Sequence, residues 1–232
     1  MHYIDTLILG ILQGLTEFLP ISSSGHLVLG QYFLNIYMPG NAFEVVLHIG
    51  TLMSVITVFR IEIKSIICDL SNSSNKFYLY ALVCGTIPAV IVGIVLKDMI
   101  SLIFDDIRFV SLSLIITGII LISSRFIIIR NLKLTMVVAF IIGLAQAGAI
   151  IPGISRSGMT ICMGLLMGLS APDAAKFSFL LSIPVIIGAG LLTAINVKAI
   201  PFGFDIILIG VSSSFLVGWI SLKWLLTILN SG

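Results

Sequence analysis

Charged side chains are scarce in this sequence. Asp, Glu, Lys and Arg make up 9% of its 232 residues, whereas 59% are hydrophobic. A soluble domain carries about 25% charged residues to cover its surface. The shortage therefore excludes an ordinary soluble domain, and the mean hydropathy of +1.22 agrees. We expect most of the surface to face lipid.

Other features are also missing. The apolar runs do not alternate with polar residues, which argues against a membrane β-barrel and leaves an all-α integral membrane protein. The N-terminus lacks a basic region and a small-residue cleavage site, so we expect no cleaved signal peptide. Cys68, Cys84 and Cys162 lack pair or metal-ligand spacing. The net charge of +2 gives no indication of nucleic-acid binding, and we expect none.

Five hydrophobic runs are long enough to span a bilayer, which takes about 20 residues. They cover residues 42–60, 77–96, 108–129, 174–196 and 204–229. Two further segments, 3–34 and 134–169, are apolar at both ends but broken by PISSSGH at 20–26 and PGISRSG at 152–158. We expect each to form a re-entrant helix pair that turns at mid-depth, with new helices starting at about His26 and Met159.

The two broken segments resemble each other. At a shift of 133 residues, six of the sixteen residues from 10 to 25 have an identical counterpart: Gly10 and Gly143, Gln13 and Gln146, Ile21 and Ile154, Ser22 and Ser155, Ser24 and Ser157, Gly25 and Gly158. Three spans separate the copies, and an odd number inverts the second. We predict one membrane domain, 1–232, with a first repeat at 1–130, a shorter second repeat at 131–232, and a site at the midplane.

Lys and Arg are distributed unevenly between the predicted loops. One side carries Arg60, Lys64, Lys76, Arg125, Arg130, Lys133, Lys176 and Lys223. The other carries Lys97, Arg108 and Lys198, with Asp98, Asp105, Asp106 and Asp205. Eight basic residues against three predict that the first side is cytoplasmic. The first broken segment then opens to the outside and the second to the cytoplasm.

Three ionisable side chains, Glu17, His26 and Arg156, lie in or beside the breaks. Such groups at membrane depth are costly and mark functional sites by default. Gln13 and Glu17 are four residues apart and share a helix face. Together they could hold a divalent cation or orient His26. The alternative is a buried hydrogen-bond network without chemistry.

The serine-rich turns precede two predicted helix starts, whose unpaired N–H groups and dipole suit phosphate. An Arg fork between two such starts would make a strong anion site. Serine is also a good N-cap, and some of these six serines are expected to serve only in that way. Glu44 and His48, four residues apart in the first span, either lie near the site or form an interfacial pair.

These motifs match a known family. Residues 13–26 (QGLTEFLPISSSGH) resemble the first signature of the bacitracin-resistance type of undecaprenyl-diphosphate phosphatases, and residues 152–160 (PGISRSGMT) resemble the second. Residues 43–50 and 177–184 are also similar to that family. By this resemblance, the expected catalytic residues are Glu17, Ser23, His26 and Arg156. The expected substrate-binding residues are Ser22, Ser24, Gly25, Ser155, Ser157, Gly158 and Thr160.

The resemblance implies a hydrolase that removes the terminal phosphate of undecaprenyl diphosphate and so recycles the carrier lipid for cell-wall synthesis. It implies a divalent cation, Mg²⁺ or Ca²⁺, near Gln13 and Glu17. It further implies the bacterial cytoplasmic (inner) membrane, an active site on the periplasmic side, and contact with membrane lipid; we include a homodimer among the expected partners. Which of Ser23 and His26 attacks phosphorus stays open.

Two departures from the family pattern stand out. Gln13 is neutral where the family accepts Glu or Gln, so a metal here would have one fewer carboxylate. The sequence stops at Gly232, where most members continue into one more span, so the second repeat is expected to have two full spans against three.

Three other functions fit parts of the pattern. A lipid-phosphate transporter or flippase could use the same midplane anion site, but it would release no phosphate. The type-2 phosphatidic-acid phosphatases share a Pro-Ser-Gly-His signature, but they need a second His downstream of their Ser-Arg, and no His follows His48 here. An intramembrane serine protease could use a Ser/His pair, but it has no use for Arg156.

Overall fold

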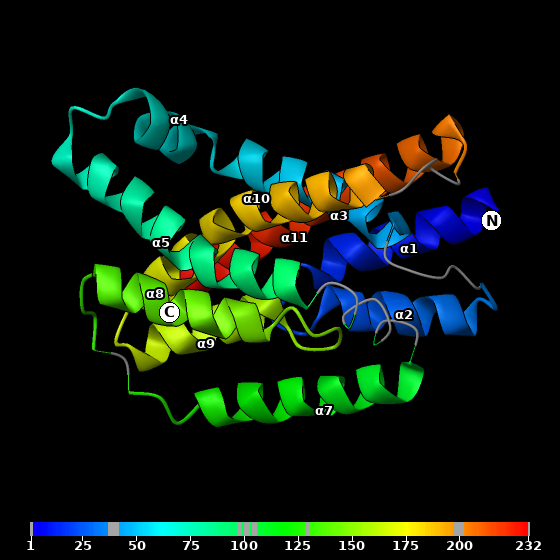
Figure 1. The fold of residues 1–232 in the computed structure, drawn as a ribbon, viewed down its shortest axis with the longest axis horizontal. Coiled ribbons are helices and arrows are strands. Elements are labelled where there is room, and N and C mark those ends of the chain that lie inside the picture. The colour runs from blue at the N-terminus through cyan, green and yellow to red at the C-terminus, as the bar shows by residue number, and fades with distance from the viewer. Residues whose placement is uncertain are drawn as a thin grey trace.

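The computed structural model describes residues 2–36, 42–96, 99, 103, 106–128, 130–196 and 202–231. These residues form ten α-helices and no strand (Figure 1). The helices are α1 Tyr3–Thr16, α2 Ser23–Phe33, α3 Ala42–Val58, α4 Arg60–Cys68, α5 Ser73–Val95, α7 Ile107–Ser124, α8 Met136–Gly148, α9 Arg156–Leu166, α10 Ala171–Asn196 and α11 Phe204–Ser231. The all-α prediction is therefore confirmed.

Four of these helices, α5, α7, α10 and α11, are long and apolar enough to cross a membrane. A fifth candidate is α3 together with α4, which bend by 75° where they join and would count as one broken span. The bend separates the apolar α3 from a helix that begins Arg60-Ile61-Glu62-Ile63-Lys64, and these charges favour an interfacial position for α4. The chain is thus a multi-pass membrane protein with four candidate spans, or the expected five if α3 and α4 count as one.

The two broken segments form the predicted helix pairs, α1 with α2 and α8 with α9. At about 1.5 Å per residue, the 14 residues of α1 and the 13 of α8 are too short to cross the roughly 30 Å hydrocarbon core. In Figure 1 the two hairpins enter from opposite ends of the bundle and their tips meet near its centre. This is the arrangement expected of re-entrant pairs in inverted repeats.

The predicted starts of the second helices were wrong by three residues. α2 begins at Ser23 and α9 at Arg156, rather than at His26 and Met159. The reason is capping, because the side chains of Ser22 and Ser155 accept the N–H groups of Gly25 and Gly158. The first turn of each helix therefore lies inside the motif, which places Arg156 and Ser23 on helices.

Glycines let each hairpin pack closely on one long span. Helix α1 packs on α11, and a Cβ added to Gly10 would lie 3.1 Å from the Gly210 carbonyl oxygen. Helix α8 packs on α5, and a Cβ on Gly143 would lie 2.8 Å from the Gly85 Cα. Gly10 and Gly143 are partners in the 133-residue shift, and small residues allow such close approach in membranes.

The division of the chain into two repeats at residues 130 and 131 stays a prediction.

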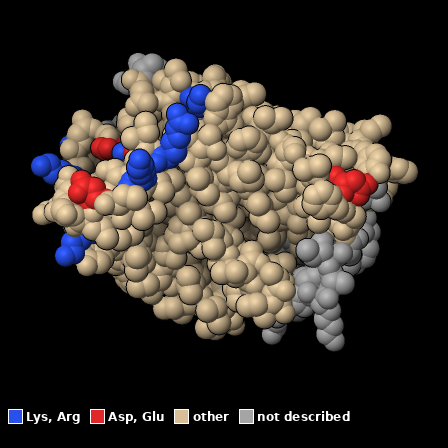
Figure 2. Space-filling view, turned by 90° about the horizontal axis from the view of Figure 1, so that it is seen from above, with Lys and Arg blue, Asp and Glu red and all other residues tan. Residues whose placement is uncertain are grey.

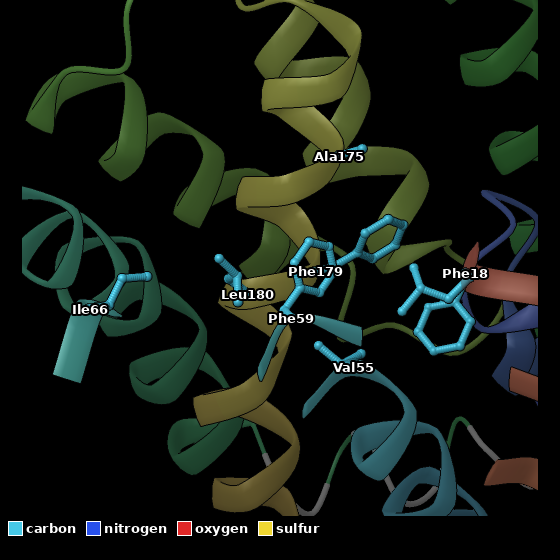
Figure 3. Packing of buried hydrophobic residues seen from close by; sticks show 8 residues of the cluster. Phe18, Val55, Phe59, Ile66, Ala175, Phe179 and Leu180 are labelled. Atoms are coloured by element: carbon cyan, nitrogen blue, oxygen red, sulfur yellow. The ribbon is translucent and has the colours of Figure 1, made fainter. Parts of the chain in front are cut away.

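A cluster of buried apolar side chains anchors the segment that leaves α1. Phe18 lies edge-on against Phe179 of α10, with ring centroids 5.6 Å apart, and both rings are buried. Val55 and Phe59 pack in the same cluster (Figure 3). Edge-to-face aromatic pairs add to the stabilisation from burial. The preceding residue, Glu17, is therefore held in a fixed position.

Basic residues gather at one end of the molecule. On the face that Figure 2 shows, Lys and Arg lie at the left end, together with some acidic residues. At the right end that face shows acidic residues without Lys or Arg among the described part. This is the asymmetry that the positive-inside rule uses. Lys97, Asp98, Asp105 and Lys198, which the sequence assigns to the outer side, lie outside the described residues.

Candidate active site

The tips of the two hairpins touch each other. Ser157 Oγ donates a hydrogen bond to the Leu19 carbonyl at 3.2 Å. In the other direction, the Gly153 N–H donates to Ser24 Oγ at 3.4 Å. Helix α7 braces the second tip, because Thr117 Oγ1 donates to the Gly153 carbonyl at 2.8 Å. The tips therefore form one structure from segments about 130 residues apart.

The serines of the two tips make matching hydrogen bonds. Ser22 Oγ caps α2 and lies 3.3 Å from Ser24 Oγ. Ser155 Oγ caps α9 and lies 3.3 Å from Ser157 Oγ. Ser22 has a φ of 69°, a strained value for a residue with a side chain. The repeat seen in the sequence thus reappears in the side-chain geometry.

Glu17 lies at the centre of the site, with a 6% exposed surface. Its Oε1 forms an ion pair with Arg156 Nη2. Its Oε2 accepts from Ser23 Oγ at 2.6 Å and from Gln13 Nε2 at 3.1 Å. His48 Nε2 lies 3.3 Å from the same oxygen. A buried carboxylate needs such partners, and this one draws them from both hairpins and from α3.

His48 faces acceptors with both ring nitrogens. Nδ1 lies 2.7 Å from the Glu44 carbonyl oxygen, which can only accept, so Nδ1 carries a hydrogen. Nε2 faces the Glu17 carboxylate. When that carboxylate is ionised, Nε2 must also carry a hydrogen, and the ring is an imidazolium. Glu17 then has two cationic neighbours, His48 and Arg156.

A cavity of about 220 Å³ opens beside Glu17. Its polar wall comes from both hairpin tips, α3 and α8: Glu17, Ser22, Ser23, Ser24, Glu44, His48, Gln146, Ser155, Arg156 and Ser157. Its apolar wall comes mainly from α10 and the second tip: Val45, Ala149, Ile150, Ile154, Val185, Ile186 and Ala189. A polar wall facing an apolar one suits a lipid with a charged head.

Most of the residues predicted from the sequence line this cavity, but some lie elsewhere. Gly25, Gly158, Thr160, Gln13 and His26 are not among the described residues that line it. The N–H groups of both glycines are used by the caps. Thr160 Oγ1 lies 2.6 Å from Ser178 Oγ and links α9 to α10. His26 Nδ1 lies 2.8 Å from the Ser22 carbonyl oxygen, within its own hairpin tip.

Three cavity residues were missed or left open by the sequence. Glu44 and His48 line the cavity, which decides between the two readings of that pair in favour of the site. Their i, i+4 spacing was the available signal. Gln146 is buried in the wall with 1% exposure. Its identity with Gln13 across the repeats was visible in the sequence but served only to align them.

The donors around Glu17 bear on the predicted divalent cation. Mg²⁺ and Ca²⁺ take oxygen ligands, with carboxylates foremost. Both oxygens of Glu17 are already taken up by Arg156, Ser23, Gln13 and His48. Within the described residues, no group of three or more His, Cys, Asp or Glu side chains could hold a metal. This arrangement does not fit a cation at Gln13 and Glu17, so the chemistry proposed for the cavity uses the chain's own groups.

Comparisons with known proteins identify the family of the chain. Residues 6–232 match the family described as "Bacitracin resistance protein BacA". The chain is 38% identical to an "Undecaprenyl-diphosphatase" of Desulforapulum autotrophicum, an alignment that covers 100% of this chain and 92% of that protein. It is 39% identical to a protein of the same name from Methanosphaera stadtmanae, over 99% of this chain and 91% of the relative.

A third relative, the "Undecaprenyl-diphosphatase" of Halothermothrix orenii, is 40% identical over 100% of this chain and 91% of its own length. The match to the family therefore extends over both hairpins and the spans between and after them. The chain belongs to the bacitracin resistance protein family.

Proposed function

We propose that this chain hydrolyses undecaprenyl diphosphate to undecaprenyl phosphate and inorganic phosphate, and so returns the carrier lipid to cell-wall synthesis. One observation carries the proposal: Ser23 Oγ donates a 2.6 Å hydrogen bond to the same carboxylate that holds Arg156. A hydroxyl nucleophile, its base and a phosphate-binding cation thus meet at one cavity. The names of the relatives supply the substrate.

In this reaction Ser23 is the nucleophile and Glu17 the general base. Ser23 Oγ attacks the terminal phosphorus while its proton passes to Glu17 Oε2, the atom it already contacts. The bond between that phosphorus and the bridging oxygen breaks, and undecaprenyl phosphate leaves with the bonding electrons. Glu17 gives this proton to the departing phosphate and can then deprotonate a water molecule, which attacks the phosphoserine. Ser23 Oγ leaves phosphorus and takes the proton back from Glu17. No other reactant is needed.

Arg156 has the role of binding the terminal phosphate. Its Nη2 pairs with Glu17, while its Nη1 is buried without a hydrogen-bond partner in the described part of the chain. A buried donor without a partner is costly, and a phosphate oxygen would satisfy it. Because the guanidinium lies at the first turn of α9, the positive end of that helix dipole adds to the binding.

His48 and His26 support the reaction differently. His48 Nε2 lies 3.3 Å from Glu17 Oε2, so its positive charge stabilises the ionised base. His26 contacts the Ser22 carbonyl, next to the nucleophile, and holds the tip in place. The sequence left Ser23 and His26 open as nucleophiles. The position of Ser23 in the cavity wall favours Ser23.

The location of the protein is part of the same proposal. The gathering of Lys and Arg at one end supports insertion in the bacterial cytoplasmic membrane with that end inside. The first hairpin then opens to the periplasm, the side on which the substrate is released. Bacitracin resistance follows, because dephosphorylation removes the diphosphate lipid from the outer leaflet. We also propose a homodimer, which the mass of the detergent-solubilised protein tests.

The test is phosphate release from undecaprenyl diphosphate by the purified protein and two variants. We expect Ser23→Ala to lower the rate by about 10³-fold or more, because the nucleophile is gone. Ser123→Ala is the matched control, since Ser123 is an exposed serine of α7 that donates only to the Ile119 carbonyl of its own helix. It should keep the parent rate. A parent that binds the lipid but releases no phosphate would instead indicate a flippase.

A further inference from the structure

Gln146 is a buried amide that the reaction above does not use. It lies near the end of α8, 1% exposed, in the wall of the cavity. Neither Nε2 nor Oε1 has a hydrogen-bond partner among the residues that the structure describes. Buried amides are nearly always hydrogen-bonded, so an unsatisfied one in a cavity wall is a donor available to a ligand that enters the cavity.

Its repeat partner shows that the amide donor at this position can be satisfied within the protein, although Gln13 Oε1, like Gln146 Oε1, has no partner among the described residues. Gln13, the equivalent residue at a shift of 133, donates to Glu17 at 3.1 Å and lies 3.4 Å from Thr51 Oγ1. In the second repeat the position equivalent to Glu17 is Ile150, which has no acceptor to offer. The second glutamine therefore belongs to the cavity wall and has no side-chain partner among the described residues.

Only two buried side-chain donors of the described residues lack a partner: Arg156 Nη1 and Gln146 Nε2. Both belong to residues of the same cavity wall. A diphosphate has two phosphate groups, each with free oxygens that can accept. The terminal phosphate must lie at Ser23 and Arg156 for the reaction to occur. This leaves Gln146 for the other phosphate.

The surroundings of Gln146 suit the phosphate that carries the lipid. Ala149 and Ile150, three and four residues further along, also line the cavity, so Gln146 is a polar group beside an apolar stretch of wall. Val185 and Ile186 of α10 extend the apolar lining. A phosphate bound here would direct its prenyl chain along apolar side chains.

We propose that Gln146 binds the phosphate that stays on the lipid, with Nε2 donating to one of its oxygens, and thereby selects a diphosphate over a single phosphate. The inference rests on the proposed function for the position of the terminal phosphate. It adds a second subsite, on the second hairpin, that recognises the product as well as the substrate.

Direct binding of two ligands to the parent and to Gln146→Met tests this. The ligands are farnesyl phosphate, which presents a lipid-bearing phosphate, and inorganic phosphate, which occupies the Arg156 subsite. Calorimetry on detergent-solubilised protein needs no turnover. We expect Gln146→Met to raise the Kd of farnesyl phosphate about tenfold, the loss of one hydrogen bond to a charged group. The Kd of inorganic phosphate should not change.

Two further variants separate recognition from misfolding. Methionine has a similar shape and no unsatisfied amide, so Gln146→Met should keep or raise the Tm. Gln146→Glu, which exchanges the NH₂ donor for an oxygen, should weaken farnesyl phosphate binding further. Leu144→Met, at a half-exposed position of α8 two residues away, is the control and should bind both ligands as the parent does.

Equal losses for both ligands in Gln146→Met would mean that the residue shapes the whole cavity, and unchanged binding of both would mean that it contacts neither. Either result overturns the inference. Failure of the proposed function looks different, because the parent would then release no phosphate from farnesyl diphosphate even though the two affinities could still be measured.

Discussion

Ser23 and Arg156 occupy the same position of the two repeats, and they bind the two different oxygens of one carboxylate. They are 133 residues apart, and each is the first residue of its helix after a capping serine. Ser23 donates to Glu17 Oε2, and Arg156 pairs with Oε1. The second repeat has Ile150 where the first has Glu17. A symmetric scaffold thus holds an asymmetric site, with the base and nucleophile on one hairpin and the cation on the other.

Replacing Glu17 should affect both activity and stability. We expect Glu17→Ala to abolish phosphate release, because the base is lost. The variant also leaves Arg156 and His48 without their counter-charge, which should lower the free energy of unfolding by about 3 kcal/mol. Phosphate release and thermal unfolding in detergent measure the two effects. Normal activity in a correctly inserted variant would remove Glu17 from the mechanism.

Arg156→Lys should keep the fold and lose most of the activity. A lysine ammonium cannot pair with Glu17 and bind a phosphate oxygen through a planar fork at the same time. We expect a loss on the order of 2–4 kcal/mol in transition-state stabilisation. The loss should be equal for undecaprenyl and farnesyl diphosphates, since the defect lies at the phosphate. Steady-state kinetics on both substrates test this, and turnover like that of the parent would leave Arg156 a structural partner of Glu17 only.

The position of His26 predicts which substitution it tolerates. Its Nδ1 contacts the Ser22 carbonyl, and an asparagine side chain can place a donor near the position of Nδ1, whereas glutamine places one near Nε2. We therefore expect His26→Asn to keep more of kcat than His26→Gln. Equal and complete loss in both variants would show that Nε2 takes part in the chemistry, as the resemblance to the family implies.

The donors around Glu17 predict how the protein responds to divalent cations. Because four side-chain groups already surround this carboxylate, Mg²⁺ or Ca²⁺ alone should not raise the Tm. Thermal unfolding with added cation and with EDTA, both without substrate, measures this. If the cation alone raised the Tm by several degrees, the protein would have a cation site that the described arrangement of Gln13 and Glu17 does not provide.

The orientation can be tested with two single cysteines. Asn72 caps α5 at the end rich in Lys and Arg, and Asp205 lies at the start of α11 at the opposite end (Figure 1). Both are exposed. In a chain in which the exposed Cys68 is replaced by serine, Asn72→Cys should react with an impermeant reagent only from the cytoplasm, and Asp205→Cys only from the periplasm. Labelling of both from one side would contradict the inverted arrangement.

The sequence predicted the spans and the two broken segments because hydropathy and helix breakers are local signals. All five hydrophobic runs correspond to helices, and the breaks at 20–26 and 152–158 fall between α1 and α2 and between α8 and α9. The bend after Val58 was not predicted. Hydropathy shows how long an apolar run is, but it carries no information on the angle between that run and the helix that follows. The helix starts were misplaced because a capping serine and an ordinary loop serine look alike in one sequence.

The composition of the site was harder to predict than its location. In helix α3 the i, i+4 spacing of Glu44 and His48 marks a polar face but not what that face contacts, and His48 reaches Glu17 only through the packing of α3 in the bundle. The unsatisfied amide of Gln146 is likewise a property of three-dimensional packing. The proposed catalytic roles, the cation and the repeat boundary all stay predictions.

The ion pair between the hairpin tips also has a consequence for biogenesis. Glu17 and Arg156 are 139 residues apart, so the ribosome releases the first hairpin long before the second exists. Until α9 is in place, Glu17 lacks one of its two cationic neighbours and has only His48 to offset its charge in the bilayer. Insertion of the second hairpin therefore both completes the anion site and stabilises the first, so that a nascent chain cannot act on lipid before α9 has been made.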